Sequence, residues 1–137
     1  GDTARFAVSY KPWPVDVVRK VWEAREFSLP LGSHFTRMRS TLSSDSKEPL
    51  IVGIGIGKVP AGAKGALTRD KENGRMLFWQ PTNAEHGELG IAVLADPAMV
   101  VGFAEDAENY LMLVRVQPGR SFTYYAGSAW SRGQSGL

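Results

Sequence analysis

The stretch PVDVVRKVWEAREF, residues 14–27, decides the fold, because its apolar side chains fit a helix and a strand equally well. A helix opened by Pro14 would gather four apolar side chains on one face, namely Val17, Val18, Val21 and Trp22. Proline is favoured at the first position of a helix, which supports this interpretation. The spacing of the apolar residues alone leaves the choice open.

As a strand, the same stretch has a mixed face. Alternation along the strand places charged side chains among apolar ones, in the set Val17, Arg19, Val21, Glu23, Arg25, Phe27 and Leu29. Charged groups are rarely packed into an apolar core, so a face of this kind is typical of a sheet that lines a groove. The strand interpretation therefore predicts charged groups beside a groove.

The rest of the chain favours strands. Clusters of turn-forming residues recur every 10 to 20 residues, with short runs of β-branched and aromatic residues between them. The runs ENYLMLVRV (108–116) and RSFTYY (120–125) flank Pro118-Gly119 and predict a hairpin. We therefore expect an all-β fold, an antiparallel β-sandwich that forms a single domain over residues 1–137.

Composition excludes several classes of protein. The 137 residues carry 16 basic and 14 acidic side chains, a net charge of +2, and the basic residues form no run that would bind nucleic acid. The most apolar stretch, residues 89–104, is shorter than a membrane span and contains an Asp-Pro pair. Because the chain has no cysteine, thiol nucleophiles and thiolate metal sites are excluded. We expect no cofactor, no nucleic-acid partner and no membrane partner.

The glycine-rich run GIGIGK at residues 53–58 does not match a phosphate-binding loop, which needs a glycine at Val52 and a serine or threonine at Val59. As a strand, it leaves a strip of bare backbone along its three glycines. We expect an aromatic side chain or another backbone to pack closely on this strip, the alternative occupant being a ligand ring.

The segment EHGELGIAV, residues 85–93, suggests an acid/base pair. A strand through it would place His86 and Glu88 side by side, and the carboxylate would raise the proton affinity of the imidazole. We therefore take His86 and Glu88 as the candidate catalytic residues, the alternative being a solvated flank of a hairpin. With only two histidines and no ligand spacing we predict no metal site, although carboxylates such as Asp70, Glu72 and Glu88 leave a site for a hard cation open.

The segment SHFTRMRST, residues 33–41, places Arg37 and Arg39 on one face of a strand. Guanidinium groups bind planar carboxylates through two parallel hydrogen bonds, so this face suits an acidic sugar such as a uronic acid. The alternative is that the two arginines pair with Glu23 or Glu26 of the preceding segment.

Aromatic side chains are further candidates for binding sugars, because their faces stack on sugar rings. We take Trp79, Tyr125 and Trp130 as candidate substrate-binding residues, the alternative for each being a place in the core. Tyr124 and Tyr125 are consecutive, so on a strand one of them is expected to be buried while the other faces the opposite side.

Several segments taken together resemble a known family. They are KVWEAREFSLPLGSHFTRMRST, LIVGIGIGK, GRMLFWQP, HGELGIAVLADP and PGRSFTYYAGSAWSRG, in that order. Over nearly the whole chain they are similar to a bacterial domain-of-unknown-function family, number 4861. The resemblance implies a fold like the galactose mutarotase-like supersandwich, with a strand, turn and strand over residues 15–35. It also implies a secreted or periplasmic protein associated with the breakdown of pectin and other uronic-acid polysaccharides.

These observations lead to three alternative functions. The first is an enzyme on acidic polysaccharide, a lyase, hydrolase or epimerase, with His86 as acid or base and Arg37 or Arg39 holding the uronate. The second is a non-catalytic carbohydrate-binding module in which Trp79 and Trp130 stack on sugars. The third is a structural or self-assembling β-protein.

The resemblance also implies that residues 1–137 are a truncated part of a longer domain. The terminal runs ARFAVSY (4–10), a half-buried strand by its alternation, and FTYYAGSAW (122–130) would then lack neighbours. We expect them to pair edge to edge with another copy of the chain or with the missing part of the parent chain.

Overall fold

The structure is a computed structural model that describes residues 1–59, 64–81 and 85–133. These residues form ten strands and one 3-10 turn, η1 (Pro97–Met99). The strands are β1 (Thr3–Pro14), β2 (Lys20–Pro30), β3 (Phe35–Ser44), β4 (Leu50–Gly57), β5 (Ala66–Asp70), β6 (Arg75–Gln80), β7 (Leu89–Ala95), β8 (Val100–Glu105), β9 (Asn109–Val116) and β10 (Phe122–Trp130). No helix in the described ranges is long and apolar enough to cross a membrane.

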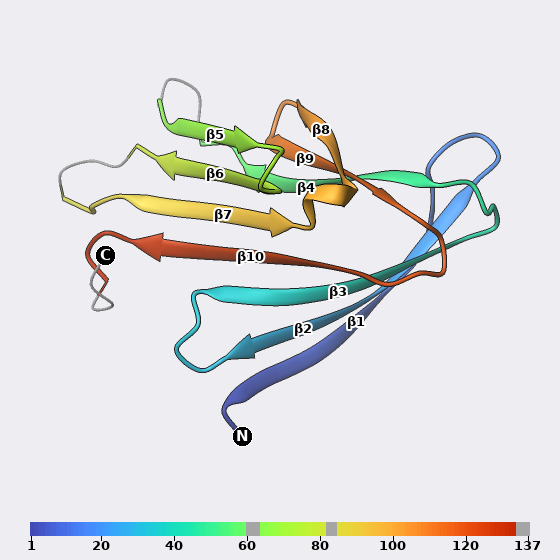
Figure 1. Cartoon of the computed structure of the whole chain (residues 1–137), viewed down its shortest axis with the longest axis horizontal. Helices are drawn as coiled ribbons and strands as arrows, with labels where there is room; N and C mark the ends of the chain where they lie inside the picture. The colour runs from blue at the N-terminus through green and yellow to red at the C-terminus, as the bar shows by residue number, and fades with distance from the viewer. Residues whose placement is uncertain (60–63, 82–84, 134–137) are drawn as a thin grey trace.

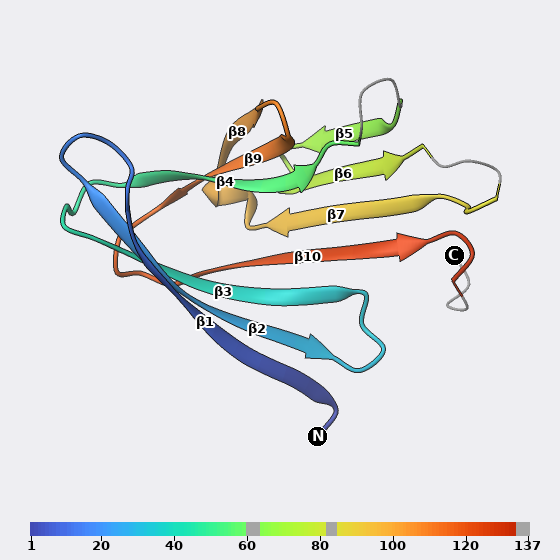
Figure 2. The same ribbon diagram turned by 180° about the vertical axis from the view of Figure 1, so that it is seen from behind.

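The strands form two antiparallel sheets. The large sheet has the order β1-β2-β3-β10-β7-β6-β5, and the small sheet has the order β4-β9-β8. In Figure 1 the small sheet lies on the side of β5, β6 and β7, while β1, β2 and β3 extend away from it. The view from behind in Figure 2 shows the same arrangement. The predicted all-β, antiparallel sandwich is confirmed.

The core lies between the inner faces of the two sheets. Alternation sends every second side chain inward, and the buried set from the large sheet includes Met76, Phe78 and Val93. The small sheet contributes Ile54, Ile56, Met112 and Val114 in the same cluster. The opposite, outer face of the large sheet has no such cover from the described strands, so its side chains are available to a ligand.

The stretch at residues 14–27 is not a helix. β1 ends at Pro14, residues 15–19 form a short loop, and β2 begins at Lys20. The carboxylate of Asp16 holds the loop, because its Oδ1 accepts the backbone N–H groups of Val18 at 2.9 Å and Arg19 at 2.7 Å. The expected strand, turn and strand over residues 15–35 is confirmed from residue 20 onward, whereas the extended conformation expected for residues 15–19 is wrong.

The predicted hairpin at Pro118-Gly119 is wrong. β9 belongs to the small sheet and β10 to the large one, so the connection crosses from one sheet to the other. Gly119 has a φ of +80°, and its N–H donates to the carbonyl of Leu42 at 2.7 Å, which ties the crossing to β3. The two flanking runs share the alternation of hairpin strands, but they belong to different sheets and do not pair.

The prediction that both terminal strands lack a neighbour holds for only one of them. β1 is an edge strand of the large sheet, whereas β10 is central and pairs with β3 and β7. The expected half-burial of β1 is also wrong, since Phe6 is 60% exposed and stacks on Phe27 at a ring-centroid distance of 4.4 Å. Only β1 therefore offers an open edge at a terminus.

The expected cover over the glycine strip is wrong as well. The three glycines of β4 lie on the exposed face of the small sheet, while Ile54 and Ile56 point into the core. The nearest side chain to a Cβ at Gly53 would be Leu111, at 3.3 Å, and nothing lies within 4 Å of such an atom at Gly57. The glycines thus leave a shallow surface beside an aliphatic neighbour on β9.

Candidate functional site

Four of the predicted substrate-binding residues lie on one surface, the outer face of the large sheet. They are Arg37 and Arg39 on β3, Tyr125 on β10 and Trp79 on β6. Tyr125 is directly opposite Arg37 in the strand register, so their side chains are neighbours on this face. All four are exposed, Tyr125 by 40% and Trp79 by 42%.

A hollow of about 420 Å³ surrounds the two arginines, and we call it the basic hollow. Its charged lining consists of Arg5, Glu26, Arg37 and Arg39. Three arginines against one glutamate leave a net charge of +2. Arg39 Nη1 lies 3.4 Å from a carboxylate oxygen of Glu26, an exposed pair that is worth little to stability. The expected pairing alternative thus applies to Arg39, while Arg37 makes no ion pair with any described residue.

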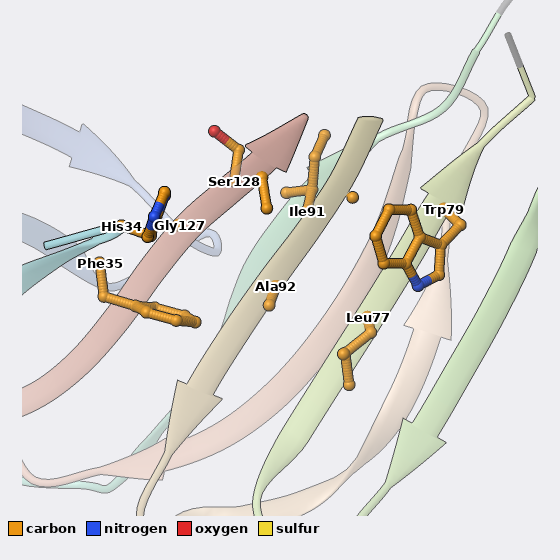
Figure 3. Close-up of a pocket in the computed structure, with 10 residues that line it drawn as sticks. His34, Phe35, Leu77, Trp79, Ile91, Ala92, Gly127 and Ser128 are labelled. Atoms are coloured by element: carbon orange, nitrogen blue, oxygen red, sulfur yellow. The ribbon is translucent and has the colours of Figure 1, made fainter. Parts of the chain in front are cut away.

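A second hollow of about 120 Å³, the apolar hollow, lies on the same face between Phe35 and Trp79. Figure 3 shows the two aromatic side chains on opposite sides of it, with Ala92 and Leu77 between them. Small residues keep the floor low, and Gly90 lies directly under the indole of Trp79, since a Cβ there would come within 2.9 Å of the ring. Phe35 and Arg37 are two residues apart on β3, so the two hollows adjoin.

His86 and Glu88 do not share a strand face, and that expectation is wrong. His86 lies in a turn before β7, and Gly87 between the two residues has a φ of +75°, which breaks the alternation. Both residues are exposed, and neither lines the basic or the apolar hollow. The catalytic role of the pair stays a prediction without the geometry that suggested it.

Trp130 lies apart from the outer-face residues. It lies an even number of residues from Tyr124 on β10 and so shares the face of Tyr124. Its indole N–H donates to the backbone carbonyl of His86 at 2.6 Å. This hydrogen bond joins the end of β10 to the turn before β7. It supports a packing role at the rim of the sheet, while the ring is still 49% exposed.

A polar cluster on the inner face was not among the candidate site residues. Glu23 is 8% exposed and Ser40 is fully buried. Arg25 donates to Glu23 from Nε at 2.7 Å and from Nη2 at 3.0 Å, and the Ser40 hydroxyl donates to the same carboxylate. The sequence did indicate this cluster through the mixed face of residues 14–27. Glu23 and Arg25 line a cleft between the sheets, as the strand interpretation implies.

Tyr124 adjoins this cluster. The Arg25 guanidinium carbon lies 5.9 Å from the centre of the Tyr124 ring and 5.4 Å from that of Tyr10. Burial raises the pKa of the Tyr124 phenol, although the positive charge of Arg25 opposes this in part. At neutral pH the phenol is therefore protonated and can donate a hydrogen bond.

Metal ligands are not grouped in the described ranges. No cluster of three or more His, Asp or Glu side chains there could hold a metal ion. Asp70, one of the carboxylates that left a hard-cation site open, instead accepts hydrogen bonds from Asn73 at 2.9 Å and from Arg75 at 2.8 Å.

Comparison with known proteins finds one family. Residues 3–137 match the model of a domain of unknown function, DUF4861. No curated protein and no solved structure matches the chain, so the expected likeness to the galactose mutarotase-like supersandwich stays a prediction.

Proposed function

The chain belongs to the DUF4861 family, and on that premise we propose that it binds acidic, uronic-acid-containing polysaccharide such as pectin on the outer face of its large sheet. A carbohydrate-binding role is favoured over catalysis because the outer face combines the arginines and the aromatic rings, whereas His86 and Glu88 lie outside both hollows. The polymer would be extracellular or periplasmic, and we accordingly propose that the protein is secreted or periplasmic.

The observation that carries this proposal is the adjacency of the basic and apolar hollows on the outer face of the large sheet. From Arg5 on β1 to Trp79 on β6 the face crosses five strand spacings, or about 24 Å at ~4.8 Å each. A surface of this length accommodates several sugar units of an extended chain. Its arginines can bind carboxylates while its aromatic rings pack on the apolar faces of the sugars.

Tyr125 joins the two hollows. It pairs with Arg37 on one side and with Leu94 of β7 on the other, so its ring lies between the arginines and the strands that carry the apolar hollow. A chain bound along the face would therefore meet charged and aromatic side chains in sequence. In this arrangement the arginines distinguish an acidic sugar from a neutral one, whereas the aromatic rings can pack against either.

Binding of polygalacturonate and of neutral galactan, measured by titration calorimetry at low salt, tests the proposal. Arg37→Ala is expected to weaken the binding of polygalacturonate about tenfold, because a charge-assisted hydrogen bond is lost. The affinity for galactan should not change. Glu26→Gln should strengthen the binding of polygalacturonate, since it releases Arg39 from its ion pair and removes a charge that repels the polymer. Arg115→Ala, which removes an exposed arginine of β9, is the matched control and should change neither affinity.

Trp79→Ala measures the contribution of the aromatic ring to binding, and it is expected to lower the affinity for both polymers. If Arg37→Ala and Arg115→Ala lower the affinity for polygalacturonate equally, binding depends on net charge alone and the outer face is not the binding site.

A further inference from the structure

The cleft between the two sheets is a third cavity, of about 330 Å³, on the opposite side of the large sheet from the two hollows. Its polar lining consists of Glu23, Arg25 and Tyr124, and its apolar lining includes Met38 and Val52. The volume is at the lower end of the range of small-molecule sites. The cavity is thus of a size that suits a compact ligand.

The ion pair in this cleft leaves one edge of the arginine unused. A guanidinium group has five N–H donors, and Glu23 takes up those of Nε and one of Nη2. The remaining edge, between Nη1 and Nη2, has the two-donor geometry that binds a carboxylate. Glu23 therefore orients Arg25 without saturating it.

Two donors in the cleft have no hydrogen-bond partner among the described residues. Every buried side-chain nitrogen or oxygen in the described part of the chain has a hydrogen-bond partner. Arg25 Nη1 and the Tyr124 hydroxyl are not in such a bond, so each atom keeps some contact with the space of the cleft. Both residues line the cleft, and their open donors are available to a bound molecule.

Stability alone does not explain the cluster. A buried ion pair is often no more stabilising than apolar residues of the same size, because both charges lose their hydration. Here a nearly buried carboxylate is also bound by the fully buried Ser40, which fixes its position and, through it, that of Arg25. An ordered charge pair that lines a cavity presents the free edge of its guanidinium group to the space of that cavity.

We propose that this cleft binds a small hydroxylated carboxylic acid, the size of one sugar acid. The ligand carboxylate accepts hydrogen bonds from the open edge of Arg25 and from the Tyr124 hydroxyl, and its body packs against Met38 and Val52. This site is independent of the polymer-binding outer face, since the two lie on opposite faces of the large sheet. Glu23 offsets the charge of Arg25, so hydrogen-bond geometry selects the ligand.

Nitrogen-15 NMR of the arginine side chains in the whole chain tests this site, with glucuronate as the probe and glucose as the matched probe without a carboxylate. Saturable shifts of the Arg25 guanidinium signals are expected with glucuronate and not with glucose. Tyr124→Phe keeps the ring and removes one donor, so the dissociation constant should rise about tenfold. Tyr110→Phe makes the same change on β9, at a residue that does not line the cleft, and should leave the dissociation constant unchanged.

Absence of saturable glucuronate binding, shifts confined to Arg37 and Arg39, or equal effects of the two tyrosine variants would each overturn the proposal. These outcomes are separate from the polymer experiment. Polygalacturonate can bind the outer face whether or not the cleft takes a monomer, and Tyr124→Phe is expected to leave polymer affinity intact.

Discussion

Tyr124 and Tyr125 are consecutive in the chain but lie on opposite faces of the large sheet. Tyr124 is 6% exposed and faces the cleft beside Arg25, whereas Tyr125 is 40% exposed and faces outward beside Arg37. One strand therefore supplies an aromatic side chain to each of the two proposed sites. The pair also gives two variants with the same chemical change and different surroundings.

The pH dependence of stability should report on Tyr124. Burial raises its pKa, so the folded state holds the phenolic proton more tightly than the unfolded chain, in which a tyrosine titrates near pH ~10. The stabilisation is present below that pH and is lost as the pH rises through the folded-state value. Urea unfolding between pH 8 and 11 should show the free energy of unfolding falling above pH ~10, by less in Tyr124→Phe than in the wild type.

Tyr125→Phe is the control for this measurement and should retain the wild-type alkaline loss, because Tyr124 is still present. An identical alkaline loss in wild type and Tyr124→Phe would mean that the phenol of Tyr124 is not the group responsible.

Substitution by alanine should lower the stability of the protein by different amounts at two glycines of the outer face. A Cβ at Gly127 would overlap the backbone carbonyl of His34, which cannot turn aside, whereas a Cβ at Gly90 meets the indole of Trp79, a side chain that can rotate. We expect Gly127→Ala to lower the free energy of unfolding by about 1–3 kcal/mol and Gly90→Ala by less. Gly90→Ala should instead weaken polymer binding, because it displaces the ring.

Chemical denaturation of both variants measures this difference, with Gly102→Ala as the control, since nothing lies within 4 Å of a Cβ at Gly102. Equal stability of the Gly127→Ala and Gly102→Ala proteins would contradict the close approach of β10 to His34.

The open edge of β1 should make the chain associate with itself. An edge strand offers unpaired backbone groups, and Phe6 adds an apolar side chain that is 60% exposed. Light scattering across a concentration series is expected to show association that Phe6→Lys reduces, because a charge on an edge strand opposes pairing. Leu31→Lys removes a similar apolar surface in the turn after β2 and should have little effect.

A monomer at every concentration, or equal effects of Phe6→Lys and Leu31→Lys, would show that the β1 edge is not a pairing surface.

Local alternation predicted which side chains share a face. Arg37 and Arg39 lie on one face of β3, the two tyrosines of β10 point in opposite directions, and Glu23 and Arg25 line a cleft, as the strand interpretation implied. Side chains two apart on a strand always point the same way, so this information is local to the sequence. It fails where the strand is interrupted, as it is at Gly87 and in the loop of residues 15–19.

The sequence by itself thus determined the fold class and the faces of the strands, while the tertiary structure decided which strands are neighbours. Residues 14–27 fit a helix and a strand equally well, and pairing of β2 with β1 and β3 resolves the choice. The same long-range pairing makes β10 central and sends β9 to the other sheet. Ser40 meets Glu23 across 17 residues of chain for the same reason. A strand carries unpaired hydrogen-bonding groups on both edges, and only the assembled sheet specifies what satisfies them.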